Sequence, residues 1–558
     1  MSRTSFITTI NRYLVSSLLV CAFALPIAIA NNSAERDNDS QDVSALHAYE
    51  LAELIEAQKL SSQAVVEALI DRIKQLDRTT SPPKNSSTVG IQAIIQLNPD
   101  ALELAKTLDD EAKEGRLRGP LHGVPVVVKD NIETSNMPTT AGSMALMNND
   151  TKRDAPIIAR LKSAGAIILA KTNLSEWANF RDADSVSGWS GVGGQTRNPH
   201  SLDRTPCGSS SGTGAAIAAQ YAPLGIGTET NGSIICPSTM NGIVGFKPTV
   251  GLVSRSGIVP ISVTQDTAGP MTRSVKDAAL MLHVMSGTDA NDPASLKADE
   301  YKQDYIASLN TPLKGKRIGV FRAVQSEHTQ IIAALDEAVE TLKNLGVEIV
   351  DIEEYETPEG FWPQALQVLL TEFKHELNRY LANAAPEVEH RDLKALIEYN
   401  QSTPRELSVF GQSLFIDAQA TEGYDDSYQE ALAFLRKTTR EEGIDRLLNE
   451  QKLDAIMMPS QTPAFLIDPV YGDSFPGGFA GAGWMAAIAG YPHVSVPMGS
   501  MKGLPIGLSF MGAQWDDASL LNIAYQYEQA SQKRITPQMS LNAFENAQFK
   551  QSMKPLNE

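Results

Sequence analysis

Two absences outline this 558-residue chain: it has few cysteines, and beyond its first 30 residues it has no long apolar run. The three cysteines are Cys21, Cys207 and Cys236. A disulfide between the last two and a pair of buried free thiols are both compatible with the sequence. No stretch after residue 30 approaches the ~20 continuous apolar residues with which a helix spans a bilayer, so we expect no membrane-spanning helix there.

The chain also lacks an excess of basic residues and any histidine pair with metal-binding spacing. Lysine and arginine total 47 against 66 acidic residues, a formal net charge of −19. This charge disfavours nucleic acid or an anionic membrane as a partner and fits an acidic, solvated surface. The eight histidines show no His-x-x-x-His or His-Glu-x-x-His pattern. We therefore predict no metal site and no cofactor.

The first 30 residues differ in character from the rest of the chain. Arg3 and Arg12 form a basic start without any acid, Tyr13–Ile29 is apolar, and Ala28-Ile29-Ala30 offers a small-x-small cleavage site. We expect residues 1–30 to be a cleaved signal peptide and the mature protein to be periplasmic or secreted. Its net charge would then be near −21, from 45 basic and 66 acidic residues.

Two other interpretations of this segment remain open. An uncleaved membrane anchor is disfavoured by Pro26 and by the polar stretch after Ala30. A lipoprotein would use Cys21, but the preceding Val20 is bulky where a small residue is expected.

After residue 44, helical patterns alternate with short apolar strands. Helices are predicted over Ala45–Leu76 with a break at Ser61-Ser62, Asp100–Glu114, Asp154–Ser163, Thr213–Gln220, Ile331–Leu345 and Trp484–Ala489. Strands are predicted up to Lys129 and over Ala166–Ala170, Leu224–Thr228, Arg317–Phe321, Val347–Val350, Leu453–Met458, His493–Met498 and Ile506–Phe510. Phe361–Asn449 is predicted to be a mostly helical outer layer. The alternation predicts an α/β fold with a large mixed, mostly parallel sheet covered by helices on both faces.

Two serine-bearing glycine turns lie between Arg204 and Pro248. The first is Cys207-Gly208-Ser209-Ser210-Ser211-Gly212, and the second is Thr230-Asn231-Gly232-Ser233. Glycine permits close backbone approach and positive φ, and successive free N–H groups in such turns can bind a developing negative charge. Serines in glycine turns are mostly turn formers, so either turn alone is a weak indication of catalysis.

A third element, Gly123-Val124-Pro125-Val126-Val127-Val128-Lys129-Asp130, places a lysine at the end of an apolar strand. Together the three elements resemble the amidase signature family, serine hydrolases that act on carboxylic amides. In that family a Gly-Val-Pro-x-x-x-Lys-Asp lysine is followed by two serine turns whose key serines are 24 residues apart. Ser209 and Ser233 have this separation. The resemblance runs from about His47 to about Gln532.

The resemblance implies one large domain, although the chain length alone would suggest three or four. We expect a disordered tail over residues 31–44, a single amidase domain over 45–540 and a C-terminal tail over 541–558. Hydrophobic residues make up 42% and charged residues 20% of the chain, which fits a globular enzyme.

The resemblance also implies a Ser-Ser-Lys mechanism. Ser233 is the expected nucleophile, and Lys129 is the expected base once burial lowers its pKa. Ser209, at a cis peptide bond, would pass the proton between them, and Ser210 would support this relay. Three backbone N–H groups of the second turn would form the oxyanion hole: those of Thr230, Asn231 and Gly232.

Several candidates have a purely structural interpretation. A lysine after a strand is usually a solvated charge, and Asp130 is expected to be a turn or cap residue. Four other charged residues near the motifs are expected to brace loops rather than act in chemistry: Asp203, Arg204, Asp266 and Arg273.

The first turn also fits the Gly-x-Ser-x-Gly nucleophile elbow of α/β hydrolases, with Ser210 as the nucleophile. That elbow must follow a buried strand, whereas His200–Pro206 cannot form a central strand. The triad would also need a histidine, and no local pattern favours His375, His390 or His493. We regard this as the minor alternative.

The predicted function is hydrolysis of carboxylic amides to acid and ammonia. The first turn, Gly232–Pro237 and Gln265–Met271 resemble the peptide amidase subgroup, which removes C-terminal amides of peptides. Many relatives carry arginine where Ile235 stands, so the pocket is expected to be lined differently. A general aliphatic or aryl amidase, and an inactive secreted binding protein on this scaffold, are the alternatives. We expect a small-molecule or peptide amide as substrate and no obligate protein partner.

Overall fold

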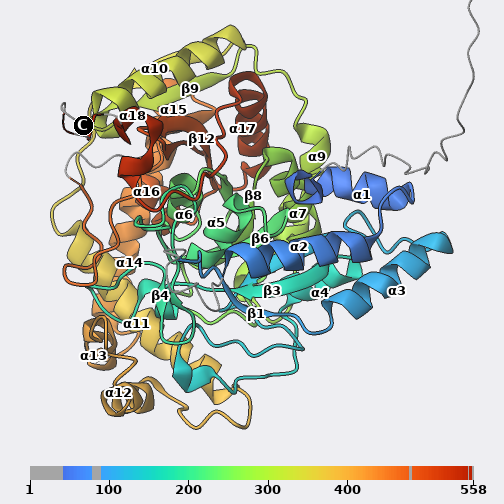
Figure 1. Cartoon of the computed structure of the whole chain (residues 1–558). Coiled ribbons are helices and arrows are strands. Elements are labelled where there is room, and N and C mark those ends of the chain that lie inside the picture. The colour runs from blue at the N-terminus through green and yellow to red at the C-terminus, as the bar shows by residue number, and fades with distance from the viewer. Residues whose placement is uncertain (1–41, 78–88, 477–480, 551, 554, 556–558) are drawn as a thin grey trace, which may run out of the picture. The chain divides into compact units, whose positions relative to one another are not determined.

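The computed structural model describes residues 42–77, 89–476, 481–550, 552–553 and 555 (Figure 1). The predicted signal peptide and most of the predicted N-terminal tail lie outside these residues. Val43–Ala45 form a short 3-10 helix. Val43–Glu558 form one compact unit. The segment predicted as a C-terminal tail contains the 3-10 helix Ala543–Glu545 and α18 (Ala547–Lys550).

The described residues form an eleven-stranded sheet in the order β1-β3-β2-β6-β8-β7-β12-β13-β11-β9-β10. Its strands are β1 (Ile94–Leu97), β2 (Pro125–Lys129), β3 (Ile167–Thr172), β6 (Leu224–Glu229), β7 (Val244–Lys247), β8 (Thr267–Thr272), β9 (Arg317–Phe321), β10 (Glu348–Ile352), β11 (Ala455–Pro459), β12 (His493–Met501) and β13 (Leu504–Met511). A separate short pair consists of β4 (Trp189–Ser190) and β5 (Gly194–Gln195).

The sheet is mixed, with parallel pairing in two blocks. One block is β3-β2-β6 and the other is β11-β9-β10. The strands between the two blocks pair antiparallel, as does β1 with β3. The predicted α/β class with a large mixed sheet is confirmed. Strands β1, β7 and β8 of this sheet were not predicted; β8 contains Gly269 and Pro270, which are rare in strand interiors.

The α-helices of the described residues include those that were predicted and six that were not, namely α6 to α9, α17 and α18. They are α1 (Ala48–Glu56), α2 (Ser62–Leu76), α3 (Ala101–Lys113), α4 (Pro156–Ser163), α5 (Ser211–Ala218), α6 (Ile235–Met240), α7 (Val275–Met285), α8 (Ala298–Tyr301), α9 (Tyr305–Ser308), α10 (Thr329–Asn344), α11 (Phe361–Ala382), α12 (Leu393–Ser402), α13 (Ser413–Gln419), α14 (Asp426–Thr439), α15 (Asp445–Gln451), α16 (Gly483–Ala489), α17 (Asp517–Ser531) and α18.

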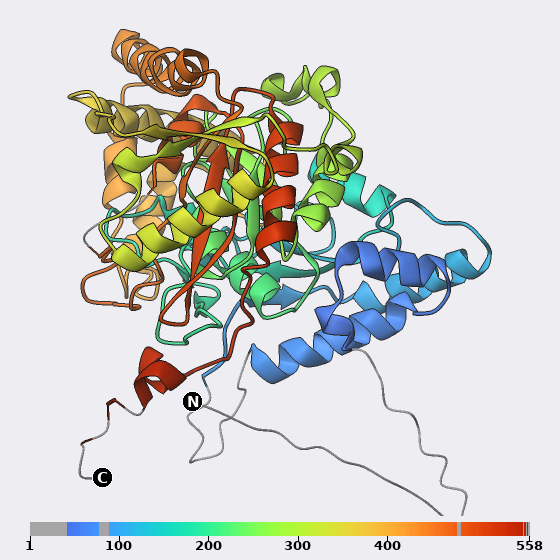
Figure 2. The same cartoon turned by 90° about the horizontal axis from the view of Figure 1, so that it is seen from above.

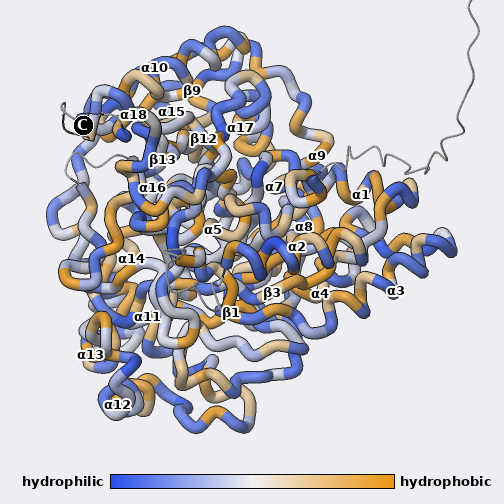
Figure 3. The backbone as a smooth tube through the Cα atoms, viewed as in Figure 1, coloured by the Kyte–Doolittle hydropathy of each residue, from blue (hydrophilic) through white to orange (hydrophobic). Residues whose placement is uncertain are grey.

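The local sequence explains where α2 begins and which face it buries. The Ser61 hydroxyl accepts a hydrogen bond from the Ala64 N–H at 3.1 Å, a helix N-cap that follows the predicted break. Val65, Leu69 and Ile73 recur on one face and are buried. Figure 3 shows the same contrast on a larger scale, with hydrophobic residues along β1 and β3 and a hydrophilic outer end on α3.

Helices cover both faces of the sheet (Figure 2). On one face α17 contacts both α7 and α10, and all three contact the central strands; on the other α5 and α6 lie side by side. Helix α5 is fully buried and, apart from Ile217, consists of small residues. A Cβ atom at Gly212 would lie 2.4 Å from the Ala93 carbonyl oxygen, so only glycine lets the start of α5 approach the backbone this closely.

Helices α11 to α15 form the outer layer predicted for Phe361–Asn449. The inner face of α11 packs Phe373, Leu377 and Leu381 into a second apolar cluster with Trp177 and Phe415. Among the described residues, no helix is both long and apolar enough to cross a membrane.

Candidate active site

Lys129 is the last residue of β2 and is completely buried. Strand β2 runs parallel to β6, so the carboxyl ends of both strands meet at one edge of the sheet. This pairing places Lys129 beside Thr228, near the end of β6. Lys129 Nζ lies 2.8 Å from Thr228 Oγ1, 3.2 Å from the Thr228 carbonyl oxygen and 2.8 Å from Ser209 Oγ.

Burial controls the protonation of this lysine. Loss of hydration disfavours the ammonium form and lowers the pKa of Lys129 from 10.5 to about 7. The negative charges of Asp266 and Glu229 act in the opposite direction but are smaller effects. At neutral pH a substantial fraction of this side chain is therefore a free amine.

The first serine turn leads into α5 and is fixed by its neighbours. The Gly208–Ser209 peptide bond is cis, as the family resemblance implies. The Ser209 carbonyl oxygen accepts a hydrogen bond from the Ser175 N–H at 3.1 Å. Ser210 Oγ accepts from the Thr228 N–H at 3.2 Å and donates to the Thr228 carbonyl oxygen at 3.1 Å. Ser210 therefore ties the turn to β6.

The second turn connects β6 to α6 and is held by Glu229. One oxygen of this buried carboxylate accepts the Ile234 N–H at 2.7 Å and the Ile235 N–H at 3.0 Å. It thereby satisfies two of the free N–H groups at the start of α6. Gly232 has φ +83°, and no protein atom lies within 4 Å of where its Cβ would be. Glycine is required here by the backbone conformation rather than by crowding.

The predicted nucleophile and oxyanion groups lie together in this turn. The Ser210 N–H donates to the Ser233 carbonyl oxygen at 3.2 Å, so the two serine turns touch through their backbones. Within the described part of the chain, the N–H groups of Thr230, Asn231 and Gly232 have no protein acceptor. The Ser233 hydroxyl likewise forms no hydrogen bond there, including to Ser209. The structure thus joins Lys129 to Ser209 directly and brings the backbone of Ser233 to that of Ser210.

A disulfide joins the two turns covalently. Cys207 precedes Ser209 by two residues and Cys236 follows Ser233 by three, and their sulfur atoms are bonded. Both cysteines are buried beside Phe465. Of the two possibilities compatible with the sequence, the structure has the disulfide rather than free thiols.

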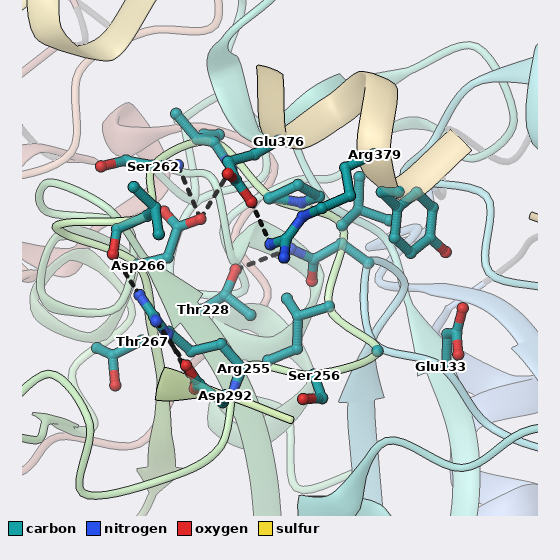
Figure 4. Close-up of a pocket in the computed structure, with 18 of the residues that line it drawn as sticks. Glu133, Thr228, Arg255, Ser256, Ser262, Asp266, Thr267, Asp292, Glu376 and Arg379 are labelled. Atoms are coloured by element: carbon teal, nitrogen blue, oxygen red, sulfur yellow. Dashed lines mark hydrogen bonds and ion pairs between the residues drawn. The ribbon is translucent and has the colours of Figure 1, made fainter. Parts of the chain in front are cut away.

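A cavity of about 370 Å³ adjoins the lysine side of the site (Figure 4). Thr228 and Thr230 form its inner end, and the loop over residues 255–263 forms one wall. Glu376 and Arg379 reach it from α11. Ion pairs between described residues line it: Glu133–Arg153, Arg255–Asp292 and Glu376–Arg379. The cavity lining therefore combines apolar side chains with charged pairs.

The elbow alternative finds no support in this geometry. Both hydrogen bonds of Ser210 Oγ go to the Thr228 backbone, and the residues before the turn form no strand. His493 lies in β12 and is bonded to Ser509 at 2.6 Å. No histidine among the described residues contacts Ser210.

Sequence reasoning missed three residues of the site and underrated a fourth. Thr228, Glu229 and Asn131 were not candidates, although Asn131 Nδ2 donates to Thr228 Oγ1 at 3.0 Å. The signal that could have identified these three residues was their position in the sequence, because each follows or ends a predicted strand that leads into a motif. Asp266, expected to brace a loop, accepts a hydrogen bond from the Thr230 hydroxyl at 2.6 Å. Asp130, expected in a turn, pairs with Lys171 at 3.0 Å.

Fold and site together define an amide-hydrolysing α/β enzyme, and comparison with known proteins agrees. The amidase family model matches residues 64–521, so the chain belongs to the amidase family. A probable amidase of Arabidopsis thaliana is 34% identical over 533 residues, covering 93% of this chain and 96% of the relative. A glutamyl-tRNA(Gln) amidotransferase subunit of Thermoanaerobacter pseudethanolicus is 33% identical, covering 88% and 98%.

Two solved peptide amidase structures are similar over most of their length. Peptide amidase from Stenotrophomonas maltophilia is 43% identical with a TM-score of 0.82, covering 89% of this chain and 99% of that one. The peptide amidase PAM in complex with the competitive inhibitor chymostatin is 45% identical with a TM-score of 0.83, covering 88% and 99%.

Proposed function

We propose that amide hydrolysis by this chain uses Ser233 as nucleophile, Ser209 as proton relay and Lys129 as base. The observation that carries the proposal is the set of partners around Lys129 Nζ. A neutral amine offers two N–H donors and one lone pair. The two oxygens of Thr228 match the two N–H groups, because a carbonyl oxygen can only accept and a hydroxyl oxygen can accept as well. The lone pair then faces the hydroxyl of Ser209.

In this mechanism Ser209 gives its proton to Lys129 and receives the proton of Ser233. Ser233 Oγ attacks the amide carbonyl carbon, and the carbonyl oxygen becomes an oxyanion. The unpartnered N–H groups of Thr230, Asn231 and Gly232 are the donors that stabilise this charge. The proton on Lys129 returns through Ser209 to the leaving nitrogen, the C–N bond breaks and ammonia departs. Water repeats the sequence on the acyl-enzyme and releases the acid.

We further propose that the preferred substrates are C-terminal amides of peptides. Support comes from the two peptide amidases, which are 43% and 45% identical to this chain, whereas the plant amidase is 34% identical. The same assignment is supported by three segments that resemble the peptide amidase subgroup: the Cys207 turn, Gly232–Pro237 and Gln265–Met271. We also propose a periplasmic or secreted location; the signal-peptide pattern of residues 1–30 supports it, and the disulfide is compatible with it.

A substrate panel tests this proposal with the purified chain from residue 31 onward. Ammonia release is measured for peptide amides, short aliphatic amides, aryl amides, long-chain acyl amides and free glutamine. We expect the highest kcat/KM for peptide amides. We expect the internal peptide bonds of these substrates to remain uncleaved. A preference for long acyl chains would refute the peptide assignment. Hydrolysis of glutamine that depends on added partner proteins would favour the amidotransferase role.

A further inference from the structure

Asp266 connects the oxyanion turn to the wall of the adjoining cavity. One of its carboxylate oxygens accepts the Thr230 hydroxyl at 2.6 Å. The other accepts the backbone N–H groups of Ile261 and Ser262 at 2.8 and 2.9 Å. In Figure 4, Asp266 and Ser262 lie on the side of the cavity opposite Arg379 of α11. A single carboxylate thus sets the position of the turn relative to the wall.

The connection continues into the outer helical layer. Ser262 Oγ donates to the buried Glu372 of α11, and the hydroxyl of Tyr428 on α14 donates to the other oxygen of Glu372 at 2.7 Å. The oxyanion turn is therefore linked through Asp266 to helices that are distant in the sequence. The backbone of Thr230 is held at one end by β6. Its side chain is oriented by this chain of hydrogen bonds.

Asp266 also places a negative charge near the base. Its charge acts on Lys129 at the end of β2, as does that of Glu229 at the end of β6, and Arg255 of the cavity wall acts on Asp266 itself. Arg255 shares its charge with Asp292 and interacts with Glu376 of α11. Burial raises the pKa of Asp266 to about 6, so it is mostly ionised at neutral pH. Its charge favours the protonated form of Lys129.

We propose that Asp266 is a positioning residue of the amidase reaction with two separable effects. Through Thr230 it fixes the oxyanion turn, and through its charge it tunes the proton affinity of Lys129. The inference rests on the Ser-Ser-Lys mechanism proposed above. It assigns a reaction role to a residue for which sequence reasoning expected only loop bracing.

Three variants separate the two effects. Asp266→Asn removes the charge and weakens the hydrogen bond to Thr230. Thr230→Val removes this hydrogen bond and keeps the charge of Asp266. Thr230→Ser keeps both the hydroxyl and the charge and loses only the methyl group. Asp517→Asn is the matched control. Asp517 is likewise buried, has a pKa raised to about 6, and accepts the hydroxyl and N–H of Thr249 at 2.7 and 2.9 Å, away from the catalytic turns.

The experiment measures kcat and KM against pH on a peptide amide, after circular dichroism has verified that each variant is folded. We expect Asp266→Asn and Thr230→Val to lower kcat by ~10–100-fold with little change in KM, because misplaced oxyanion donors act on the transition state. Only Asp266→Asn should move the acid limb of the profile, to lower pH by ~0.5–1 unit, because it removes a neighbouring negative charge. Thr230→Ser should recover most of the activity.

The inference is overturned if Asp266→Asn leaves both kcat and the acid limb unchanged, or if Asp517→Asn shifts the limb equally. If Asp266→Asn does not fold, Thr230→Val with Thr230→Ser still decides the positioning effect: equal kcat values in these two and the wild type would refute it. Failure of the mechanism itself gives a different result, namely an acid limb that persists in an active Lys129→Met variant.

Discussion

At the scale of single residues, the proposed mechanism makes Lys129 the group through which pH acts on catalysis. The base must be neutral, and burial lowers its pKa to about 7. Activity should therefore fall as pH drops below this value and reach a plateau above it, because protonation removes the lone pair. Lys129→Met should lose activity by ~10²–10⁴-fold near neutral pH. Initial rates of ammonia release from pH 5 to 9 measure both effects.

Lys247 provides a matched control for this prediction. It is also completely buried and burial lowers its pKa to about 8, but its hydrogen bond goes to the Pro248 carbonyl oxygen at 3.2 Å. A folded Lys247→Met variant should keep the acid limb of the wild type. If the limb disappears in Lys247→Met and remains in Lys129→Met, the base has been assigned to the wrong lysine.

We expect substitutions of Ser233 and Ser210 to have different effects on covalent labelling. Ser233→Ala should abolish hydrolysis and covalent labelling by a serine-directed reagent, because it removes the attacking oxygen. Ser210→Ala should retain labelling at a reduced rate, because its hydroxyl only holds Thr228. Intact-mass spectrometry after labelling distinguishes them. Labelling that survives in Ser233→Ala and vanishes in Ser210→Ala would restore the nucleophile-elbow alternative.

At the scale of elements, the disulfide joins the start of α5 to α6. It joins Cys207 to Cys236, which are 29 positions apart in the sequence. Restricting the unfolded chain to such a loop stabilises a fold by ~3–4 kcal/mol in the chain-entropy model. The double variant Cys207→Ser/Cys236→Ser should lose about this much free energy of unfolding, measured by urea denaturation. In reducing buffer, the wild type should have the same free energy of unfolding as the double variant. The two proteins should differ only in oxidising buffer, which serves as the control.

A second element-scale prediction concerns Glu528, which links α17 to the start of α7. Its carboxylate accepts the Val275 N–H at 3.0 Å, and burial raises its pKa to about 8, well above its ordinary 4.5. The folded state therefore holds a proton that the unfolded state releases. The contribution of Glu528 to the free energy of unfolding is fully present below about pH 4.5 and is lost as pH rises toward 8.

Glu528→Gln should remove that dependence, because a neutral amide keeps an oxygen acceptor for Val275. We expect the variant to be more stable than wild type at pH 9 by ~1 kcal/mol or more and similar at pH 5. Urea denaturation at the two pH values measures this difference. Equal pH dependence in both proteins would show that Glu528 is ionised in the fold.

Local patterns predict most elements, and non-local contacts explain what they miss. Strand β9 was predicted to the residue because an apolar run there is bounded by polar turns. Strand β8 was missed because its Gly269 and Pro270 argue against a strand, and only pairing with β6 and β7 makes it one. Lys129 and Ser209 were predicted from motifs, whereas Asp266 depends on Thr230, 36 residues away, and no local signal reports that contact.

At the scale of the whole molecule, the site is assembled from segments that the sheet brings together. Lys129 ends β2, Ser209 lies in the turn before α5 and Ser233 lies in the turn between β6 and α6, and the cavity wall adds α11 from the outer layer. The strands fix the base and the turn that follows β6, while the connections after β7 and the outer helices shape access. Substrate access is therefore shaped by the loop over residues 255–263 and by α11, whereas the proposed base and the two serine turns lie around β2 and β6.

Export is the prediction that concerns the molecule as a whole. The basic start, apolar core and Ala28-Ile29-Ala30 predict cleavage before Asn31, and an oxidising compartment would let Cys207 and Cys236 pair. Expressing the full chain in a Gram-negative host should yield periplasmic protein whose N-terminus is Asn31. The same material should carry no free thiol at these two cysteines. A variant starting at Met-Asn31, kept in the cytoplasm, is the control and should show free thiols by mass spectrometry after alkylation. Full-length cytoplasmic protein with an intact Met1 would contradict the prediction, since the leader would then have no effect on where the enzyme folds.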